Sequence, residues 1–201
     1  MLYCCLKNVK KMNLYLKKHI NLSFKNSTEI TEFYRSLKID YPKFFKMDGL
    51  SKLGFLASEM IFENEENRFI EREDIAIICF NCSSSLEIDM QYQETIRDNE
   101  NYFPSPSLFV YTLPNIVTGE IAIRNKFFGE TSFYICKNFD EQQILRTVKN
   151  AFIDNTINTV LTAWIEYFNG KIEVFMFLVD KVSKENITFA EKNLKKLFKS
   201  C

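Results

Sequence analysis

Hydrophobic residues along the chain fall into strand-like runs separated by helix-like periods. Residues 13–24 alternate in the manner of a first or edge strand. Unbroken apolar runs follow at 75–80, within the strand expected at 74–81, and at 174–179, within the strand expected at 171–182. An unbroken run is typical of a strand covered on both faces, so we expect every strand of this sheet to be covered in that way. Asn169-Gly170 joins residues 157–168 to the last run, and this dipeptide strongly favours a two-residue hairpin turn.

Helical periods fill the intervals between these strands. The clearest begins after Asp48, which is expected to cap a helix over residues 50–61. Further helices are expected at 29–37, 83–97, 113–127, after Asp140-Glu141 and after 183–186, with a loop at 99–107 and a short strand at Ser132–Cys136. The resulting order predicts an α/β fold. It consists of a five-stranded, mixed, mostly parallel sheet with helices on both faces and an antiparallel last strand.

Composition and charge narrow the class of protein. At 201 residues with 46% hydrophobic content, the chain fits one globular domain, 1–201, in which residues 1–11 could be an upstream extension before Met12. The 26 basic and 26 acidic residues cancel, so no electrostatic footprint for nucleic acid is expected. No apolar run approaches the roughly 18 residues of a membrane span, and the first residues do not resemble a secretory signal. We therefore expect a cytoplasmic protein.

The chain has six cysteines and a single histidine, His19. Cysteines in a cytoplasmic protein are reduced, and their spacing here describes no disulfide framework. Cys79 and Cys82 form a CxxC pair, but no second ligand pair follows, so no zinc site is expected. A thioredoxin-like redox pair would lie at such a strand-to-helix turn. The interpretation we favour is two strand-end cysteines held in apolar packing.

Three segments carry a family resemblance: "FFKMDGLSKLGFLASEMIF", "DIAIICFNCSSSLEIDMQYQETI" and "SPSLFVYTLPNIVTGEIAIRNKFFGETSFYI". They resemble the N-terminal half of β-ketoacyl-ACP synthases, over roughly residues 41–180. The most specific parts are Thr112–Asn115 and Gly119–Arg124. The resemblance implies half of a thiolase fold, with three α/β/α layers around the five-stranded sheet.

The same resemblance implies where a catalytic cysteine would lie. In the family it follows the strand in an elbow of small residues and is activated at a helix N-terminus. Asn138 occupies the equivalent position here, and the elbow reads Cys136-Lys137-Asn138-Phe139. Cys136 comes two residues too early, a full pleat back on the strand. The family's two catalytic histidines belong to the C-terminal half, which this sequence does not cover. No condensing activity is therefore expected from the chain alone.

A non-catalytic partner role remains. Chain-length-factor-like subunits pair with a full-length 3-oxoacyl-ACP synthase, and short proteins similar to this one occur in aryl-polyene and flexirubin-type pathways. The resemblance implies a heterodimer of this kind, or a homodimer, built on the strand with Phe133, Tyr134 and Cys136. It also implies that the preceding helix, with Thr112, Leu113, Asn115 and Ile116, lines the partner's acyl tunnel. The alternative for that helix is a plain core helix.

Two other functions stay open at this stage. Cys136 could accept an acyl group in a half-size acyltransferase, although no base lies near it in the sequence. A remnant binding module could instead hold the acidic helix of acyl carrier protein through Lys192, Lys195, Lys196 and Lys199. None of the three readings requires a metal or cofactor.

Overall fold

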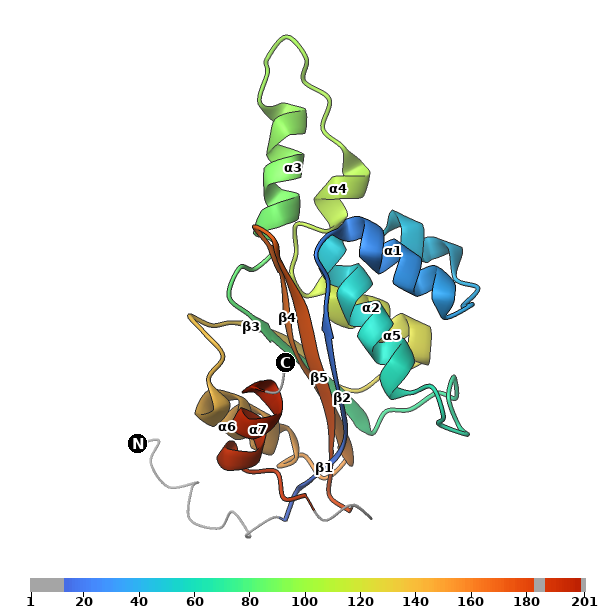
Figure 1. Cartoon of the computed structure of the whole chain (residues 1–201), viewed down its shortest axis with the longest axis vertical. Helices are drawn as coiled ribbons and strands as arrows, with labels where there is room; N and C mark the ends of the chain where they lie inside the picture. The colour runs from blue at the N-terminus through green and yellow to red at the C-terminus, as the bar shows by residue number, and fades with distance from the viewer. Residues whose placement is uncertain (1–12, 183–186, 200–201) are drawn as a thin grey trace.

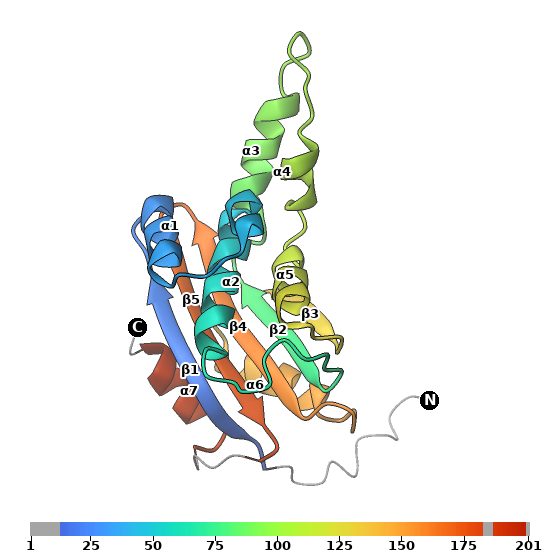
Figure 2. The same cartoon turned by 90° about the vertical axis from the view of Figure 1, so that its right-hand side faces the viewer.

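A computed structural model describes residues 13–182 and 187–199, so the predicted upstream extension and the connection at 183–186 lie outside the described residues. The described chain forms one sheet with the strand order β1-β5-β4-β2-β3 (Figures 1 and 2). Its strands are β1 (Tyr15–Ser23), β2 (Ile75–Asn81), β3 (Thr131–Ile135), β4 (Thr159–Phe168) and β5 (Lys171–Asp180). β5 pairs antiparallel with β1 and β4, whereas β2 pairs parallel with β3 and β4. The predicted mixed sheet with an antiparallel last strand is confirmed.

Helices cover both faces of this sheet. They are α1 (Ser27–Ser36), the short 3-10 helix η1 (Pro42–Lys46), α2 (Gly49–Ile61), α3 (Leu86–Ile96), α4 (Pro106–Val110), α5 (Ile116–Asn125), α6 (Glu141–Ala151) and α7 (Glu191–Lys199). In Figure 1, α1, α2 and α5 lie on one face, and α6 and α7 lie on the other. The two helices α3 and α4 extend together beyond the end of the sheet, and we call them the arm. The expected three-layer architecture is therefore present.

Two hydrophobic clusters make up the core, one on each face of the sheet. The first fills the space beneath α2 and α5 and includes Leu53, Phe55 and Ile121, each with no exposed surface. The second lies beneath α6 and α7, where Val148 and Leu194 are fully buried. The helix faces expected from three- and four-residue spacing point inward in both layers.

Local sequence signals explain the best-defined boundaries. Asp48 caps α2, since its carboxylate accepts hydrogen bonds from the backbone N–H groups of Leu50 and Ser51 at 3.2 and 3.0 Å. In the β4–β5 hairpin, Asn169 and Gly170 have φ values of +49° and +79°. Both residues therefore occupy the left-handed region that a type I′ turn requires.

The structure corrects several expectations. The predicted loop at 99–107 contains the first residues of α4, and the helix expected over 113–127 begins only at Ile116 and ends at Asn125. Lys126 closes that helix in the left-handed conformation, with φ of +57°. Coverage on both faces holds for β2 and for most of β4 and β5. It is wrong for β3, whose residues are exposed or half-buried, and β1 is only partly covered.

Candidate partner interface

The strand β3 forms one edge of the sheet, as Figure 2 shows at the side opposite β1. It pairs in parallel with β2, with Phe133 beside Cys79 and Tyr134 beside Phe80. No other strand in the described part of the chain lies along its outer side. The backbone N–H and C=O groups on that side are therefore available to a further strand, which is how exposed sheet edges take up a partner chain.

The side chains of this edge are unusually apolar for an exposed strand. Tyr134 is 37% exposed, with its ring stacked 5.3 Å from that of Phe80, and Ile135 is 57% exposed. Phe133 points to the opposite face of the sheet from Tyr134 and packs against the core cluster beneath α5. Tyr134 and Ile135 are thus the side chains that a partner could bury at little cost to the fold.

The arm carries a second apolar surface. Only Ile88 is buried in α3, and no residue of α4 is buried. The two helices pack on each other, with the rings of Tyr92 and Phe109 5.4 Å apart. Large apolar side chains left exposed on the arm and the turn after it are Leu86, Met90, Phe109, Val110 and Leu113. A projecting helical hairpin with this much exposed apolar surface is typical of an element that a partner covers.

A buried carboxylate fixes the base of the arm. Glu166, at the end of β4, is 2% exposed and accepts hydrogen bonds from the Cys82 backbone N–H and from the Ser83 hydroxyl, the latter at 2.7 Å. The side chain of Asn81 spans the same turn, since its Nδ2 donates to the Ser84 carbonyl at 2.8 Å and its Oδ1 accepts from the Ser84 N–H at 3.0 Å. The turn from β2 into α3 is therefore held by hydrogen bonds to the Glu166 carboxylate and by the neutral hydrogen bonds of the Asn81 amide.

The predicted tunnel residues lie in the turn that links α4 to α5. Asn115 is the residue before α5, and Ile116 is its first residue. Leu113 and Asn115 are exposed, whereas Thr112 and Ile116 are half-buried. The helix α5 packs against β3, so this turn and the exposed strand belong to the same part of the molecule. The sequence interpretation missed Ile135 and the apolar residues of α3 and α4, because their exposure depends on which elements remain uncovered.

The elbow after β3 is filled and capped rather than open. Asn138 is exposed, and its Nδ2 donates to the Phe139 carbonyl at 3.0 Å. Phe139 turns inward, with its ring stacked 3.7 Å from Phe198 and edge-on to Trp164 at 5.6 Å. Asp140 caps α6 by accepting from the backbone N–H groups of the next turn. The positive end of α6 thus already has its own carboxylate, and it is not free to stabilise a thiolate.

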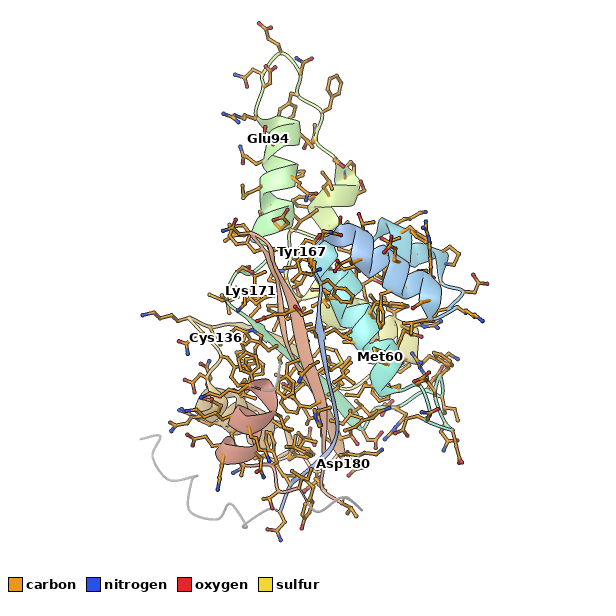
Figure 3. The ribbon with its side chains drawn as sticks, viewed as in Figure 1. Met60, Glu94, Cys136, Tyr167, Lys171 and Asp180 are labelled. Atoms are coloured by element: carbon orange, nitrogen blue, oxygen red, sulfur yellow. The ribbon has the colours of Figure 1, made fainter. Side chains whose placement is uncertain are left out.

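Cys136 lies on the segment that leads from β3 to α6 (Figure 3). Burial and then the nearby Asp140 carboxylate raise the pKa of its thiol above the ordinary value. An activated nucleophile needs the opposite shift and a base. His19 lies on β1, at the other edge of the sheet, and it is the only histidine of the chain. Within the described residues, no group of three metal-ligating side chains occurs either.

The comparisons with known proteins concern the fold. No family model and no curated protein matches the sequence. A ketosynthase in complex with its chain length factor from Xenorhabdus doucetiae matches with a TM-score of 0.65 and 14% identity, over 94% of this chain and 92% of the matched chain. The ishigamide ketosynthase/chain length factor matches with a TM-score of 0.69 and 12% identity, over 87% of this chain and 64% of that one.

A third solved structure is a type II polyketide synthase acyl-carrier protein in complex with its ketosynthase. It matches with a TM-score of 0.59 and 11% identity, over 85% of this chain and 63% of that one. The chain thus spans less than two thirds of the matched chains in the second and third structures, but nearly all of the matched chain in the first. By its architecture, this chain has the thiolase-like fold of ketosynthases and chain length factors.

Proposed function

We propose that this protein is a ketosynthase-like subunit of the chain-length-factor type, without condensing activity of its own, that pairs with a full-length 3-oxoacyl-ACP synthase. The observation that carries the proposal is the combination of an uncovered apolar strand edge with an elbow that lacks an activated thiol. Tyr134 and Ile135 are exposed beside unpaired backbone groups. Asn138 stands where a nucleophile is required, and Cys136 has a raised pKa. A chain of about this length also occurs in the ketosynthase–chain length factor complex that it matches.

The partner would cover two surfaces at once. Pairing of β3 with the partner's corresponding strand would satisfy the free backbone groups and bury Tyr134 and Ile135. The arm and the turn at Thr112–Ile116 would then lie against the synthase, where they would border the path of its acyl chain. In this arrangement the chain limits the length of a product that the synthase makes. Fatty-acid or polyene synthesis is the setting that we propose.

Acyl carrier protein is the further partner of such a pair. Lys192, Lys195, Lys196 and Lys199 are all exposed on α7, on the side of the sheet away from the α2 layer. They form a basic surface suited to the acidic helix of a carrier protein. Carrier binding therefore complements the heterodimer. The half-size acyltransferase has less support, because Cys136 lies next to a carboxylate and has no histidine near it.

The interface predicts that Ile135→Asp breaks the heterodimer. An unpaired charge in a buried interface costs about 2–5 kcal/mol, which corresponds to a loss of affinity of at least about 30-fold. Ile135 is preferred to Phe133 for this test, because Phe133 packs against the core and its replacement would also destabilise the fold. The measurement is co-expression with a full-length 3-oxoacyl-ACP synthase from the same genome, followed by size-exclusion chromatography.

The matched control is Ile153→Asp, since Ile153 has a nearly equal exposure of 59% but lies just after α6, outside the proposed interface. We expect the control to co-elute with the synthase and the Ile135 variant to elute alone, both with unchanged thermal unfolding. Co-elution of the Ile135→Asp protein at wild-type yield would place the interface elsewhere.

A further inference from the structure

Two cysteines lie opposite each other just beyond the carboxyl ends of β2 and β3. The last registered pair of these strands is Asn81 with Ile135, and the ladder continues by one more bond. In that bond the Cys136 N–H donates to the Asn81 carbonyl oxygen at 2.7 Å. In a parallel pair, a residue whose N–H bonds to one residue lies opposite the next. Cys136 therefore lies opposite Cys82.

This placement suits a disulfide. Neighbouring strands lie about 4.8 Å apart, within the range of roughly 4.4–6.8 Å that disulfides span between Cα atoms. The Cys82 Sγ donates to the carbonyl oxygen of Lys137 at 3.2 Å, so its sulfur lies over the segment that immediately follows Cys136. Both thiols are free. The Cys82 thiol also adds to the rise in the pKa of Cys136, after burial and Asp140, as expected for neighbouring groups.

The CxxC spacing, by contrast, does not mark the redox pair. Cys79 is fully buried in the core cluster beneath α2, and burial raises its pKa to about 12. Cys136 packs against the cluster on the opposite face of the sheet. Cys82 is exposed, which corrects the expectation that both members of the CxxC are held in apolar packing. The partner within reach of Cys82 comes from the next strand, not from its own.

We propose that Cys82 and Cys136 form a disulfide when the protein meets a low-molecular-weight disulfide such as oxidised glutathione. The bond would tie the base of the arm to the segment between β3 and α6. The pair is thus an oxidation site at the edge of the apolar surface, and it does not depend on the proposed function.

The reaction proceeds by two exchanges. The exposed Cys82 loses its proton to solvent and attacks one sulfur of the oxidant, whose S–S bond breaks and releases one thiolate. Cys136 then loses its proton and attacks the Cys82 sulfur, which forms the protein disulfide and expels the second thiolate. The two released thiolates take up the two protons, so the oxidant gains two electrons and the protein loses two. Because burial, and then the Asp140 carboxylate, disfavour the Cys136 thiolate, the second step should become faster as pH rises.

Peptide mapping tests the proposal. The folded full-length chain is incubated with oxidised glutathione, alkylated and digested with trypsin. The expected product is peptide 73–97 linked to peptide 127–137, which hold Cys82 and Cys136 respectively. Because the first peptide also contains Cys79, the link should persist in Cys79→Ser. It should be absent in Cys82→Ser, and Cys136→Ser should accumulate a glutathione adduct on Cys82.

A background in which Cys4, Cys5 and Cys201 are replaced by serine confines the exchange to these three thiols. The proposal would be overturned by a link to Cys79, by a link that forms only in urea, or by a wild-type chain that stops at the Cys82 adduct over the whole range from neutral to alkaline pH. Mapping of the wild-type link requires no substituted protein, so a variant that fails to fold leaves the test intact.

Discussion

Arg124, from one of the two segments most specific to the ketosynthase resemblance, helps to pack α2 against α5. Arg124 donates from Nε to Glu59 at 2.8 Å, and Arg68 pairs with the same carboxylate, which is 5% exposed. Nearer the start of both helices, Gly54 of α2 faces Val117 of α5 so closely that a Cβ would meet its methyl group. In this structure these residues of the resembling segments therefore have a packing role, which is to hold α2 and α5 together.

This contact predicts opposite effects for two glycines. Gly54→Ala should lower the free energy of unfolding by about 1–3 kcal/mol, because the added methyl group overpacks the α2–α5 contact. Gly119→Ala is the matched control within α5. Its Cβ would enter open space, so the gain in helix propensity should raise the free energy of unfolding by about 0.5–1 kcal/mol. Urea denaturation of both variants measures the difference, and a Gly54→Ala protein as stable as the wild type would contradict the packing.

At the scale of elements, the strands and most helices, α3 among them, could be predicted from the sequence, but α4 and the projection of the arm beyond the sheet could not. The buried run at Ile75–Phe80 and the Asn169-Gly170 turn depend on neighbouring residues alone, and both were confirmed. The exposure of β3 and of α3 depends on which elements lie beside them in space. The role of Glu166 was missed for the same reason, since its partners Cys82 and Ser83 are distant in sequence.

We expect the contribution of Asp48, which caps α2, to the stability of the fold to depend on pH. Asp48→Ala should lower the free energy of unfolding by about 1 kcal/mol, because it removes the cap. Asp48→Asn keeps an acceptor oxygen without the charge. Burial raises the pKa of Asp48 in the folded state, so folding favours its protonated form. The wild type should therefore lose stability relative to Asp48→Asn as pH rises from about 3 to about 6.

Asp74→Asn supplies the opposite trend as a control. Arg72 holds both carboxylate oxygens of Asp74 at 2.9 Å and lowers the pKa of that group. A lowered pKa contributes stability at pH values above the pKa of the unfolded state, and this stability is lost as pH falls. The free energy of unfolding of the wild type should therefore rise relative to that of Asp74→Asn as pH rises. Urea titrations at several pH values measure the difference in free energy of unfolding between the wild type and each Asn variant. Trends of the same sign for the two variants would contradict the opposite pKa shifts of Asp48 and Asp74.

At the scale of the whole molecule, the described part of the chain is one sheet with helices on both faces and with β1 and β3 as its two edge strands (Figure 1). No helix among residues 13–182 and 187–199 is long and apolar enough to cross a membrane. The β3 edge and the arm carry six of the exposed large hydrophobic residues, namely Leu86, Met90, Phe109, Val110, Tyr134 and Ile135. The proposed dimer rests on these exposed residues, and a 3-oxoacyl-ACP synthase is the partner that we propose.

The filled elbow predicts that one substitution cannot create an enzyme. Asn138→Cys should give no condensation of acyl and malonyl thioesters of acyl carrier protein, because the new thiol would have no base and would lie two residues from the Asp140 carboxylate. Product analysis by mass spectrometry, with a full-length synthase as the positive control, measures this. Product formed by the Asn138→Cys chain alone would overturn the non-catalytic assignment.

The order of strands in the sheet limits which strands can pair while the protein is still being synthesised. Among the described strands, β1 pairs only with β5, with Leu22 beside Val174, whereas β2 pairs with both β3 and β4. β1 therefore has no strand to pair with until β5 has been synthesised, and β2 and β3 can join β1 in one sheet only through the late β4–β5 hairpin. The hairpin forms from local contacts, and the earlier strands then close long loops onto it, which is a slow kind of folding. During translation, the apolar residues of β1 therefore stay without their strand partner until β5 appears, and such exposed apolar surface is what chaperones protect.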